Sequence, residues 1–222
     1  MTTRLNADFS EKVVILPQDY QWVNSPMPGV KRMMLDRIGD EVARATSIVR
    51  YEPNSAFSPH CHTGGEEFFV LEGVFADEHS QYPAGSYVRN PIGTSHQPQI
   101  GDEGATIFVK LHQFNAKDTK PKVIDTNNTE WRPGLVEGLN VMPLHDFEGE
   151  HVALVKWAPN TRFNPHKHWG GEEILVLEGT FHDEYGSYPK GSWLRSPHMS
   201  QHQPFTKGDG ALIFVKTGHI PD

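Results

Sequence analysis

The sequence predicts an all-β protein that is built from two tandem barrels. Residues 57–110 align without a gap on residues 163–216, at a constant offset of 106, and more than half of the aligned positions are identical. Within each copy, short segments rich in β-branched and aromatic residues are separated by Gly, Pro or Asn turns about every eight to twelve residues. No window shows the sustained i, i+3, i+4, i+7 apolar spacing of an amphipathic helix. Repetition, turn spacing and missing helical periodicity therefore point to the same fold class.

The strands of the first copy are expected at residues 44–51, 67–71, 86–89 and 106–111, where Val, Ile, Phe and Tyr are abundant. Turn residues bound each segment, as in the run 82–85, which reads Tyr-Pro-Ala-Gly. Short strands at this spacing are typical of an antiparallel sandwich or a small barrel. Each repeat is therefore expected to form one such domain.

The repeat divides the chain into two expected domains, residues 1–118 and 119–222, each long enough for a core of its own. The polar stretch 115–128 is the expected boundary, although part of it, 122–124, has strand character. Exchange of strands near 13–16 and 123–124 would pair the two barrels within one chain. A monomer and a homodimer are both consistent with this pattern.

Composition excludes several classes of function. The net charge of -8 and the lack of a Lys/Arg cluster argue against nucleic-acid binding. No run approaches the roughly 20 apolar residues that cross a bilayer, and the N-terminus lacks the apolar region of a secretory signal. A cytoplasmic protein is expected. The single cysteine, Cys61, cannot form an internal disulfide or a thiolate zinc site.

The 13 histidines are the unusual feature of the composition. Six of them form three matching pairs, with one member of each pair in each repeat. The repeated positions, with one glutamate in each copy, are His60, His62, Glu66 and His96, and His166, His168, Glu172 and His202. Alternate residues of a strand share a face, so His60, His62 and Glu66 have the same parity. Glu67 has the opposite parity, unless a bulge at Gly64-Gly65 reverses the phase.

Three imidazoles and one carboxylate that converge in a barrel would bind a divalent first-row ion and leave positions open for water, substrate or dioxygen. An isolated His-x-His pair is more often a surface feature. Here the pair occurs twice, each time with the same Glu and the same later His, while many neighbouring positions have changed. We therefore predict one divalent ion per barrel, without choosing among Zn, Fe, Mn and Ni.

Other residues have more ordinary expected roles. The carboxylates around the hairpins at 72–78 and 178–184 are expected to serve turn chemistry and solvation. Arg89 and Arg195 are expected to pair with one of these carboxylates, and Gln97 and Gln203 are candidates to orient a ligand histidine. Seven histidines have no repeat partner and are expected at the surface or around the sites: His79, His112, His145, His151, His182, His198 and His219.

The two sites are not expected to be equivalent. Trp169 replaces Thr63 beside the ligands, and the pair His198-Met199 replaces Ile92-Gly93. The two pockets should accept different ligands, or one of them should be mainly structural.

These motifs resemble those of the cupin superfamily. The first cupin motif, Gly, five residues, His-x-His, three or four residues, Glu, six residues, Gly, is matched by Asn54, His60, His62, Glu66 and Gly73. Asn54 and Asn160 replace the leading Gly, which is tolerable because Asn also adopts positive φ. The second motif is matched by Gly85, Pro91, Gly93 and His96, and in the second repeat by Gly191, Pro197, Met199 and His202, where the inner Gly is lost.

The strings GGEEFFVLEGVFADE, YPAGSYVRNP and SHQP are similar to the cupin-like domain of ChrR, a zinc-dependent anti-sigma factor. The resemblance implies a double-stranded β-helix, or jelly roll, for each domain. It also implies that the eight repeated residues are metal ligands. A sigma-factor partner is not expected, because in ChrR a separate N-terminal helical zinc domain binds the sigma factor. Here the segment before Trp22 contains no His or Cys.

Two functions follow from the resemblance and the site. The first is a metal-dependent oxygenase that acts on a small carbonyl or enol substrate, whose enolate the metal would stabilise. ChrR-like cupins resemble diketone-cleaving dioxygenases, although those lack the Glu. The alternative is a zinc-binding regulatory or ligand-sensing module without turnover. The ligand spacing identifies a site but not a reaction, and no individual catalytic residue is assigned from the sequence.

Overall fold

A computed structural model describes residues 2–221. In this part of the chain the regular structure is β, apart from two short 3-10 turns, η1 (Pro17–Asp19) and η2 (Thr126–Asn128). No helix there has the length and apolar character needed to cross a membrane. The all-β prediction is thereby confirmed.

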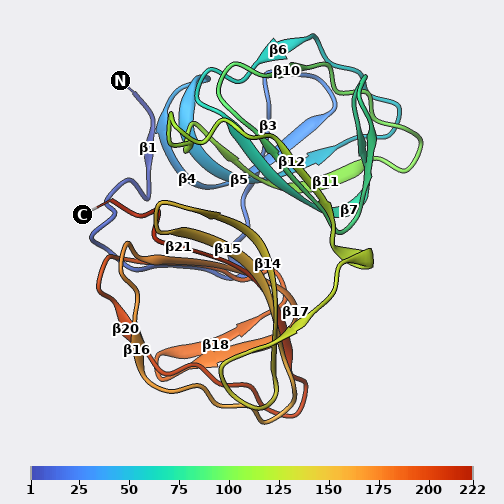
Figure 1. The fold of residues 1–222 in the computed structure, drawn as a ribbon. Coiled ribbons are helices and arrows are strands. Elements are labelled where there is room, and N and C mark those ends of the chain that lie inside the picture. The colour runs from blue at the N-terminus through green and yellow to red at the C-terminus, as the bar shows by residue number, and fades with distance from the viewer. Residues whose placement is uncertain (1, 222) are drawn as a thin grey trace. The chain divides into compact units, whose positions relative to one another are not determined.

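Contacts divide the chain into two compact units. Unit 1 contains Gln21–Thr129 together with the residues before Asp8, and unit 2 contains Asp8–Tyr20 together with the residues from Glu130 onward. Figure 1 shows each unit as a curled arrangement of strands around its own interior.

Unit 1 is an antiparallel sheet with a small two-stranded ladder. The sheet order is β1 (Arg4–Leu5), β4 (Val30–Gly39), β5 (Ala43–Tyr51), β11 (Ala105–Leu111), β7 (Glu66–Ala76), β9 (Ser86–Asn90) and β12 (Lys122–Asp125). Two further strands pair at its margins, β3 (Trp22–Asn24) with β4 and β8 (Gln81–Pro83) with β7. The separate ladder consists of β6 (His60–Cys61) and β10 (Ser95–His96). The strands expected from the first repeat are therefore present.

Unit 2 repeats this plan. Its sheet order is β13 (Arg132–Pro133), β14 (Leu139–Phe147), β15 (Glu150–Trp157), β21 (Ala211–Thr217), β17 (Glu172–Asp183), β19 (Trp193–Ser196) and β2 (Val13–Ile15), and β18 (Gly186–Pro189) pairs with β17. The ladder consists of β16 (His166–Lys167) and β20 (Gln201–His202).

Two strands pair outside the repeat with which they are continuous in sequence. β2 precedes the first repeat but pairs with β19, with Leu194 opposite Val14. β12 precedes the second repeat but pairs with β9 of the first, with Val88 opposite Val123. Each covers the outer side of a strand whose backbone groups would otherwise be an unpaired edge. The exchange expected near residues 13–16 and 123–124 is therefore observed.

The long strand β7 pairs with three other strands and contains a bulge. Its first half pairs with β11 and β9, and its second half pairs with β8. The register between β7 and β11 shifts where Thr106 pairs with Glu72 and Ile107 with Val70. Next to this bulge, Gly73 pairs with Ala105 and has φ of +68°. A Cβ on Gly73 would lie 2.2 Å from the carbonyl oxygen of Gly104, so the close approach requires glycine. Gly179 repeats this arrangement against Gly210.

Each unit has its own apolar core. In unit 1 it is centred on buried side chains such as Phe68, Phe75 and Ile107, and in unit 2 on Ile174, Phe181 and Ile213. The chain enters the His-x-His segment of each unit through an asparagine with φ of +58°, Asn54 or Asn160. The Asn-for-Gly replacement thus meets the conformation expected of it.

Candidate metal centres

The ladder and the first residue of the long strand bring the repeated histidines and glutamates together. In unit 1, β6 pairs with β10 so that His60 lies opposite His96, and Glu66 is the first residue of β7. In unit 2, His166 lies opposite His202, and Glu172 is the first residue of β17. His62 and His168 lie just beyond β6 and β16. The candidate positions of each unit therefore lie near one another.

The distances within unit 1 suit a shared ion. One ligand atom from each of His60, His62, Glu66 and His96 lies within 4.8 Å of all the others. Oε2 of Glu66 is 3.5 Å from Nδ1 of His62 and 3.7 Å from Nε2 of His96. Because bonds from nitrogen or oxygen to zinc are about 2.0–2.2 Å long, ligand atoms on opposite sides of one ion are about 4 Å apart.

Unit 2 has a similar but less symmetrical group. The nitrogens of His166, His168 and His202 lie within 4.8 Å of one another, and Nε2 of His168 is 3.0 Å from Nε2 of His202. Glu172 stands outside this group, although its Oε2 is 3.5 Å from Nε2 of His168 and 3.6 Å from Nε2 of His202. Glu172 thus approaches two of the three histidines.

The hydrogen bonds around the imidazoles leave nitrogens available for an ion. Nδ1 of His60 is 3.3 Å from the carbonyl oxygen of Ser58, and Nδ1 of His166 is 2.9 Å from that of Asn164. Donation from Nδ1–H to a carbonyl leaves the Nε2 lone pair free. Nε2 of His62 and Nε2 of His96 are buried and make no hydrogen bond. Because a buried polar atom without a partner is costly, these nitrogens fit a site for a cation.

The pKa values of these histidines and glutamates also fit a cation site. Burial, aided by His60 and His112, lowers the pKa of His62 to about 4, and burial with His202 and His166 lowers that of His168 to about 3. Burial raises the pKa of Glu172 to about 7 and also raises that of Glu66. The two histidines are neutral at pH 7 and can donate lone pairs. A divalent ion would offset the cost of burying each ionised carboxyl.

One aspartate in each unit orients the last histidine of the group. Oδ2 of Asp77 is 3.1 Å from Nδ1 of His96, and Oδ2 of Asp183 is 3.6 Å from Nδ1 of His202. A carboxylate at Nδ1 fixes the ring so that Nε2 would face an ion held by this group. Burial lowers the pKa of His202, but its interactions with Asp183 and Glu172 outweigh this and raise it.

The turn chemistry predicted for this aspartate is also present. Oδ1 of Asp77 accepts the backbone N–H groups of His79 and Ser80 at 2.9 Å. The two carboxylate oxygens therefore have separate tasks, one in the turn and one at the histidine. Sequence reasoning found only the first, because the second partner lies 19 residues away along the chain.

The next residue in each hairpin supports the same histidine through the backbone. Oε2 of Glu78 accepts the N–H of Gln97 at 2.7 Å, and Oε2 of Glu184 accepts that of Gln203 at 2.8 Å. Each glutamine is thus a hydrogen-bond donor next to the last histidine, through its backbone N–H to the hairpin glutamate. The Asp-Glu pair that both repeats keep after the long strand holds the segment that carries the last histidine.

Glu67 has a structural role that separates it from its neighbour Glu66. It accepts a 2.6 Å hydrogen bond from the hydroxyl of Tyr87 and lies 3.1 Å from Nη1 of Arg89. Nη2 of Arg89 is 2.6 Å from Oδ2 of Asp118, and all these side chains are buried. The ion pair expected for Arg89 is therefore present, but with Glu67 and Asp118 instead of a hairpin carboxylate. The pleat turns Glu67 away from the histidines, as its parity predicted.

The lost glycine of the second motif does not alter the loop. Met199 has φ of +59° where Gly93 has +89°. The N–H of Met199 donates to the carbonyl of His168 at 2.9 Å, as that of Gly93 does to His62 at 3.0 Å. Met199 therefore keeps the glycine geometry at the steric cost of a left-handed side chain.

Unit 1 opens beside its histidines into a cavity of about 460 Å³. His60, His62 and Glu66 line it together with apolar side chains of β5 and β11, among them Val49 and Val109. Arg32 of β4 and His112 also reach it. This volume is within the range of small-molecule sites in proteins.

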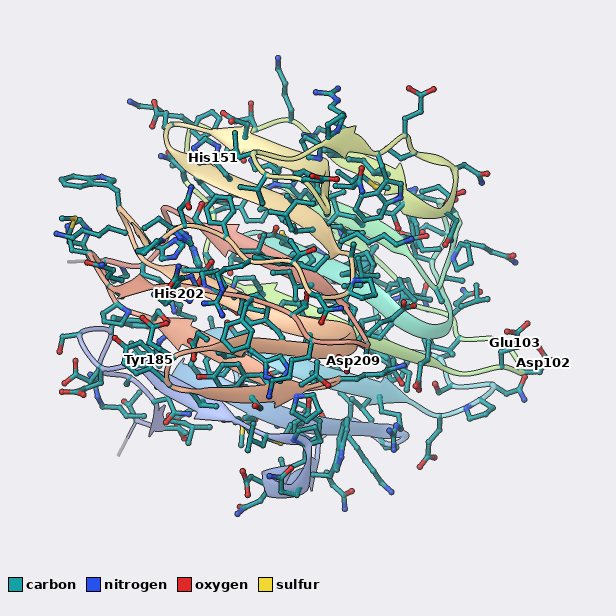
Figure 2. All side chains as sticks on the ribbon, turned by 90° about the horizontal axis from the view of Figure 1, so that it is seen from below. Asp102, Glu103, His151, Tyr185, His202 and Asp209 are labelled. Atoms are coloured by element: carbon teal, nitrogen blue, oxygen red, sulfur yellow. The ribbon has the colours of Figure 1, made fainter. Side chains whose placement is uncertain are left out.

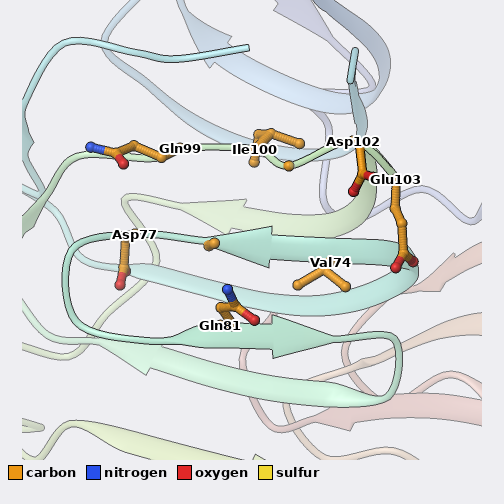
Figure 3. A pocket seen from close by; sticks show the side chains of 9 residues that line it. Val74, Asp77, Gln81, Gln99, Ile100, Asp102 and Glu103 are labelled. Atoms are coloured by element: carbon orange, nitrogen blue, oxygen red, sulfur yellow. The ribbon is translucent and has the colours of Figure 1, made fainter. Parts of the chain in front are cut away.

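A second recess, of about 410 Å³, lies on the outer side of Asp77 (Figure 3). Figure 3 shows Asp77 and Gln99 toward one end and Asp102 and Glu103 toward the other. In Figure 2 the last two project from a peripheral loop, whereas His202 lies among strands. This recess is polar and open, and it does not contain the ligand histidines.

Unit 2 fills the equivalent region. His182 and Phe205, which replace Ala76 and Gln99, stack with ring centroids 5.2 Å apart and an interplanar angle of 13°. Nδ1 of His182 is 2.8 Å from Oγ of Ser187.

The unrepeated histidines have varied positions. His79 and His151 are exposed. The side chains of three others are buried, namely those of His145, His182 and His219. His219 lies 2.9 Å from Glu173, and His182 stacks on Phe205, so packing explains these two. His198 accepts the N–H of Gly170 and contacts Trp169 beside the unit 2 ligands.

Comparison with solved structures shows the fold. The chain superposes with a TM-score of 0.78 on a protein from Nostoc punctiforme named "putative dioxygenase", at 18% identity over 95% of this chain and 84% of that one. It superposes with a TM-score of 0.67 on the oxalate decarboxylase of Lactobacillus farciminis, at 11% identity over 94% and 86% of the two chains. Salicylate 1,2-dioxygenase of Pseudoaminobacter salicylatoxidans gives 0.60, at 9% identity over 78% and 68%. At such identities the likeness shows the fold alone.

The sequence itself matches one family twice. No curated protein matches it. The family described as the ChrR cupin-like domain matches residues 10–115 and again residues 119–221, which together make up nearly the whole chain. With two jelly-roll units and one His/Glu group in each, the chain belongs to the ChrR cupin-like domain family and carries that domain twice.

Proposed function

We propose that this chain is a metal-dependent enzyme of the oxygenase type, which acts on a small carbonyl or enol substrate in the cavity of unit 1. The observation that carries the proposal is the position of His60, His62 and Glu66 in the wall of a cavity of about 460 Å³. In the proposal, these residues and His96 hold one divalent ion in unit 1, and His166, His168, Glu172 and His202 hold another in unit 2.

The chain's own residues account for the binding of the ion. His62 and His96 offer buried nitrogens that make no hydrogen bond, and Glu66 offers a buried anionic oxygen. The amide of Asn90 donates to Oε2 of Glu66 at 3.0 Å and Asp77 orients His96, so the ligands are held before the ion arrives. A divalent ion bound there would polarise a carbonyl oxygen and stabilise an enolate. The apolar wall at Val49 and Val109 would exclude water from the substrate.

Metal analysis followed by oxygen uptake tests this proposal. The protein would be purified without a nickel column, its metals measured, and oxygen uptake followed with a panel of β-diketones and related enols. We expect iron or manganese and uptake that depends on substrate. Stoichiometric zinc with no uptake from any iron- or manganese-loaded sample would rule out the oxygenase.

The alternative is a zinc-binding regulatory or ligand-sensing protein without turnover. Unit 2 favours it, because Val141 and Trp157 stand where unit 1 has Arg32 and Tyr51 in the cavity wall. A site with such walls is suited to a structural ion. Tight zinc in both units, with a ligand that binds but is not consumed, would support this alternative.

A further inference from the structure

The wall of the unit 1 cavity contains a positively charged side chain, Arg32, that the candidate metal site does not require. Among the described residues that line it, Arg32 is the single Arg or Lys. It lies in β4 opposite Val49, and alternation along the strand turns it to the interior together with Val30. The surrounding strand positions are apolar, namely Val49, Val109 and Leu111. Because a charged group in apolar surroundings is costly, this guanidinium calls for a functional or structural explanation.

The hydrogen bonds of Arg32 are incomplete. Its Nη1 is 3.4 Å from Oε2 of Glu41, whose side chain is 65% exposed. This contact is long and monodentate, and pairs exposed in this way contribute little to stability. Nε of Arg32 is buried and has no hydrogen-bond partner. Since leaving a buried donor unsatisfied is costly, Arg32 is poorly explained as a structural residue.

Unit 2 supplies an internal comparison. Val141 occupies the same register position, opposite Val155, as Arg32 does opposite Val49. Both positions lie at the same place in the same fold, and unit 2 forms that fold with a valine at this position. The positive charge is therefore a property of the unit 1 cavity and not a requirement of the barrel.

We infer that Arg32 binds a carboxylate of the substrate, so that unit 1 selects a carbonyl or enol compound bearing an anionic group. This inference rests on the proposed function of the same site. A planar guanidinium presents a fork of N–H donors that matches a carboxylate bidentately, and Nε is one arm of that fork. The carbonyl or enol end of the substrate faces His60, His62 and Glu66. The apolar walls contact the middle of the molecule.

Two probes that differ only in the carboxylate test the inference. Acetylacetone is a neutral β-diketone, and acetopyruvate is the same diketone with one methyl group replaced by a carboxylate. Binding would be measured by calorimetry on zinc-loaded protein, in which redox turnover does not interfere. The full chain would carry His168→Ala, so that only unit 1 is loaded.

Four variants define the expected result. Arg32→Gln should bind acetopyruvate about 10- to 100-fold more weakly, because hydrogen bonds to charged groups have that effect, and should bind acetylacetone equally within about twofold. Arg32→Lys should fall between Arg32→Gln and the parent. Glu41→Gln should bind acetopyruvate up to about fivefold more tightly, since it removes a competing carboxylate. The control, Arg50→Gln, removes the same charge from an exposed arginine of β5. It should leave the affinity for both probes unchanged.

The outcomes separate this inference from the proposed function. Three results would overturn the role of Arg32. They are an equal loss of acetopyruvate binding in Arg32→Gln and Arg50→Gln, an unchanged preference for acetopyruvate over acetylacetone in Arg32→Gln, and no binding of either probe. If iron-loaded protein consumes no oxygen but the preference still depends on Arg32, the oxygenase is wrong and the carboxylate site stands. Retained zinc in every variant shows that the unit 1 site remains folded.

Discussion

Unit 1 and unit 2 have the same residue types at their four ligand positions, but the walls beside these positions differ. Arg32, Tyr51 and His112 line the cavity of unit 1, and their counterparts by register or repeat offset are Val141, Trp157 and Gly218. The ligands come from one short ladder and the start of one strand, whereas the walls come from strands far apart in the sequence. In the proposed function, ion binding would be the property that duplication preserves. Substrate selection would depend on the walls, whose residues have diverged between the units.

The outer face of the hairpin differs between the units as well. Unit 1 has an open polar recess next to Asp77, and unit 2 fills the equivalent region with the stacked rings of His182 and Phe205. Both units nevertheless keep the aspartate that faces the last histidine. The comparison separates what the two sites share, which is the orientation of the ligands, from what distinguishes them.

The largest expected effect is loss of an ion from one unit only. His62→Ala should remove about one metal ion per chain, and His168→Ala should remove the other, because three ligands bind a first-row ion less tightly than four. Elemental analysis of the purified variants measures this. His79→Ala, an exposed histidine without a repeat partner, is the control and should keep both ions. A His62→Ala protein that still holds two ions would contradict the proposed unit 1 site.

The second effect concerns stability instead of metal content. Arg89→Gln should lower the free energy of unfolding by about 3–5 kcal/mol, because it leaves Glu67 and Asp118 buried without their cation. Chemical denaturation of the metal-free protein gives the value. Arg132→Gln, which removes an exposed arginine, should change it by less than about 0.5 kcal/mol. An Arg89→Gln protein as stable as the parent would mean that this buried pair does not hold unit 1 together.

A smaller effect is expected when the orienting aspartates are changed. Asp77→Asn should weaken metal binding in unit 1 by about 10- to 100-fold, and Asp183→Asn should do the same in unit 2, since the last histidine loses its anionic partner. Asparagine retains an oxygen for the turn bonds, so folding should be little affected. Competition with a chelator measures the affinities, with Glu103→Gln as a control on the exposed loop. Unchanged affinity in both variants would assign these aspartates to the turns alone.

The smallest effect tests the loop that differs between the second motifs. Met199→Gly should stabilise unit 2 by about 0.5–1 kcal/mol, because it relieves a left-handed methionine that is 44% exposed and loses little packing. Gly93→Ala should destabilise unit 1 by a similar amount for the converse reason. Thermal unfolding of both variants provides the comparison. Destabilisation by Met199→Gly would show that the methionine side chain has a packing role that outweighs its strain.

Local pattern was sufficient for much of the fold and for the grouping of the candidate site. The strands at 44–51 and 106–111 and the positive φ of Asn54 follow from residue types and turn chemistry. The parity of His60, His62 and Glu66 predicted that they would share a face, and the structure brings them together with His96. These predictions succeed because the pleat alternates with a period of two, and because duplication repeats the important spacings.

Contacts between distant strands decided the rest. Nothing in the sequence pairs Asp77 with His96, Arg89 with Asp118, or Arg32 with the cavity of the histidines. His182 stacks on Phe205 and His219 lies 2.9 Å from Glu173, and these partners become neighbours only on folding. The sequence alone therefore determined the repeated strands and the candidate ligand positions, which depend on alternation within short segments. Only the tertiary structure decided the orienting aspartates, the buried ion pair and the cavity walls, because these depend on which distant strands lie side by side.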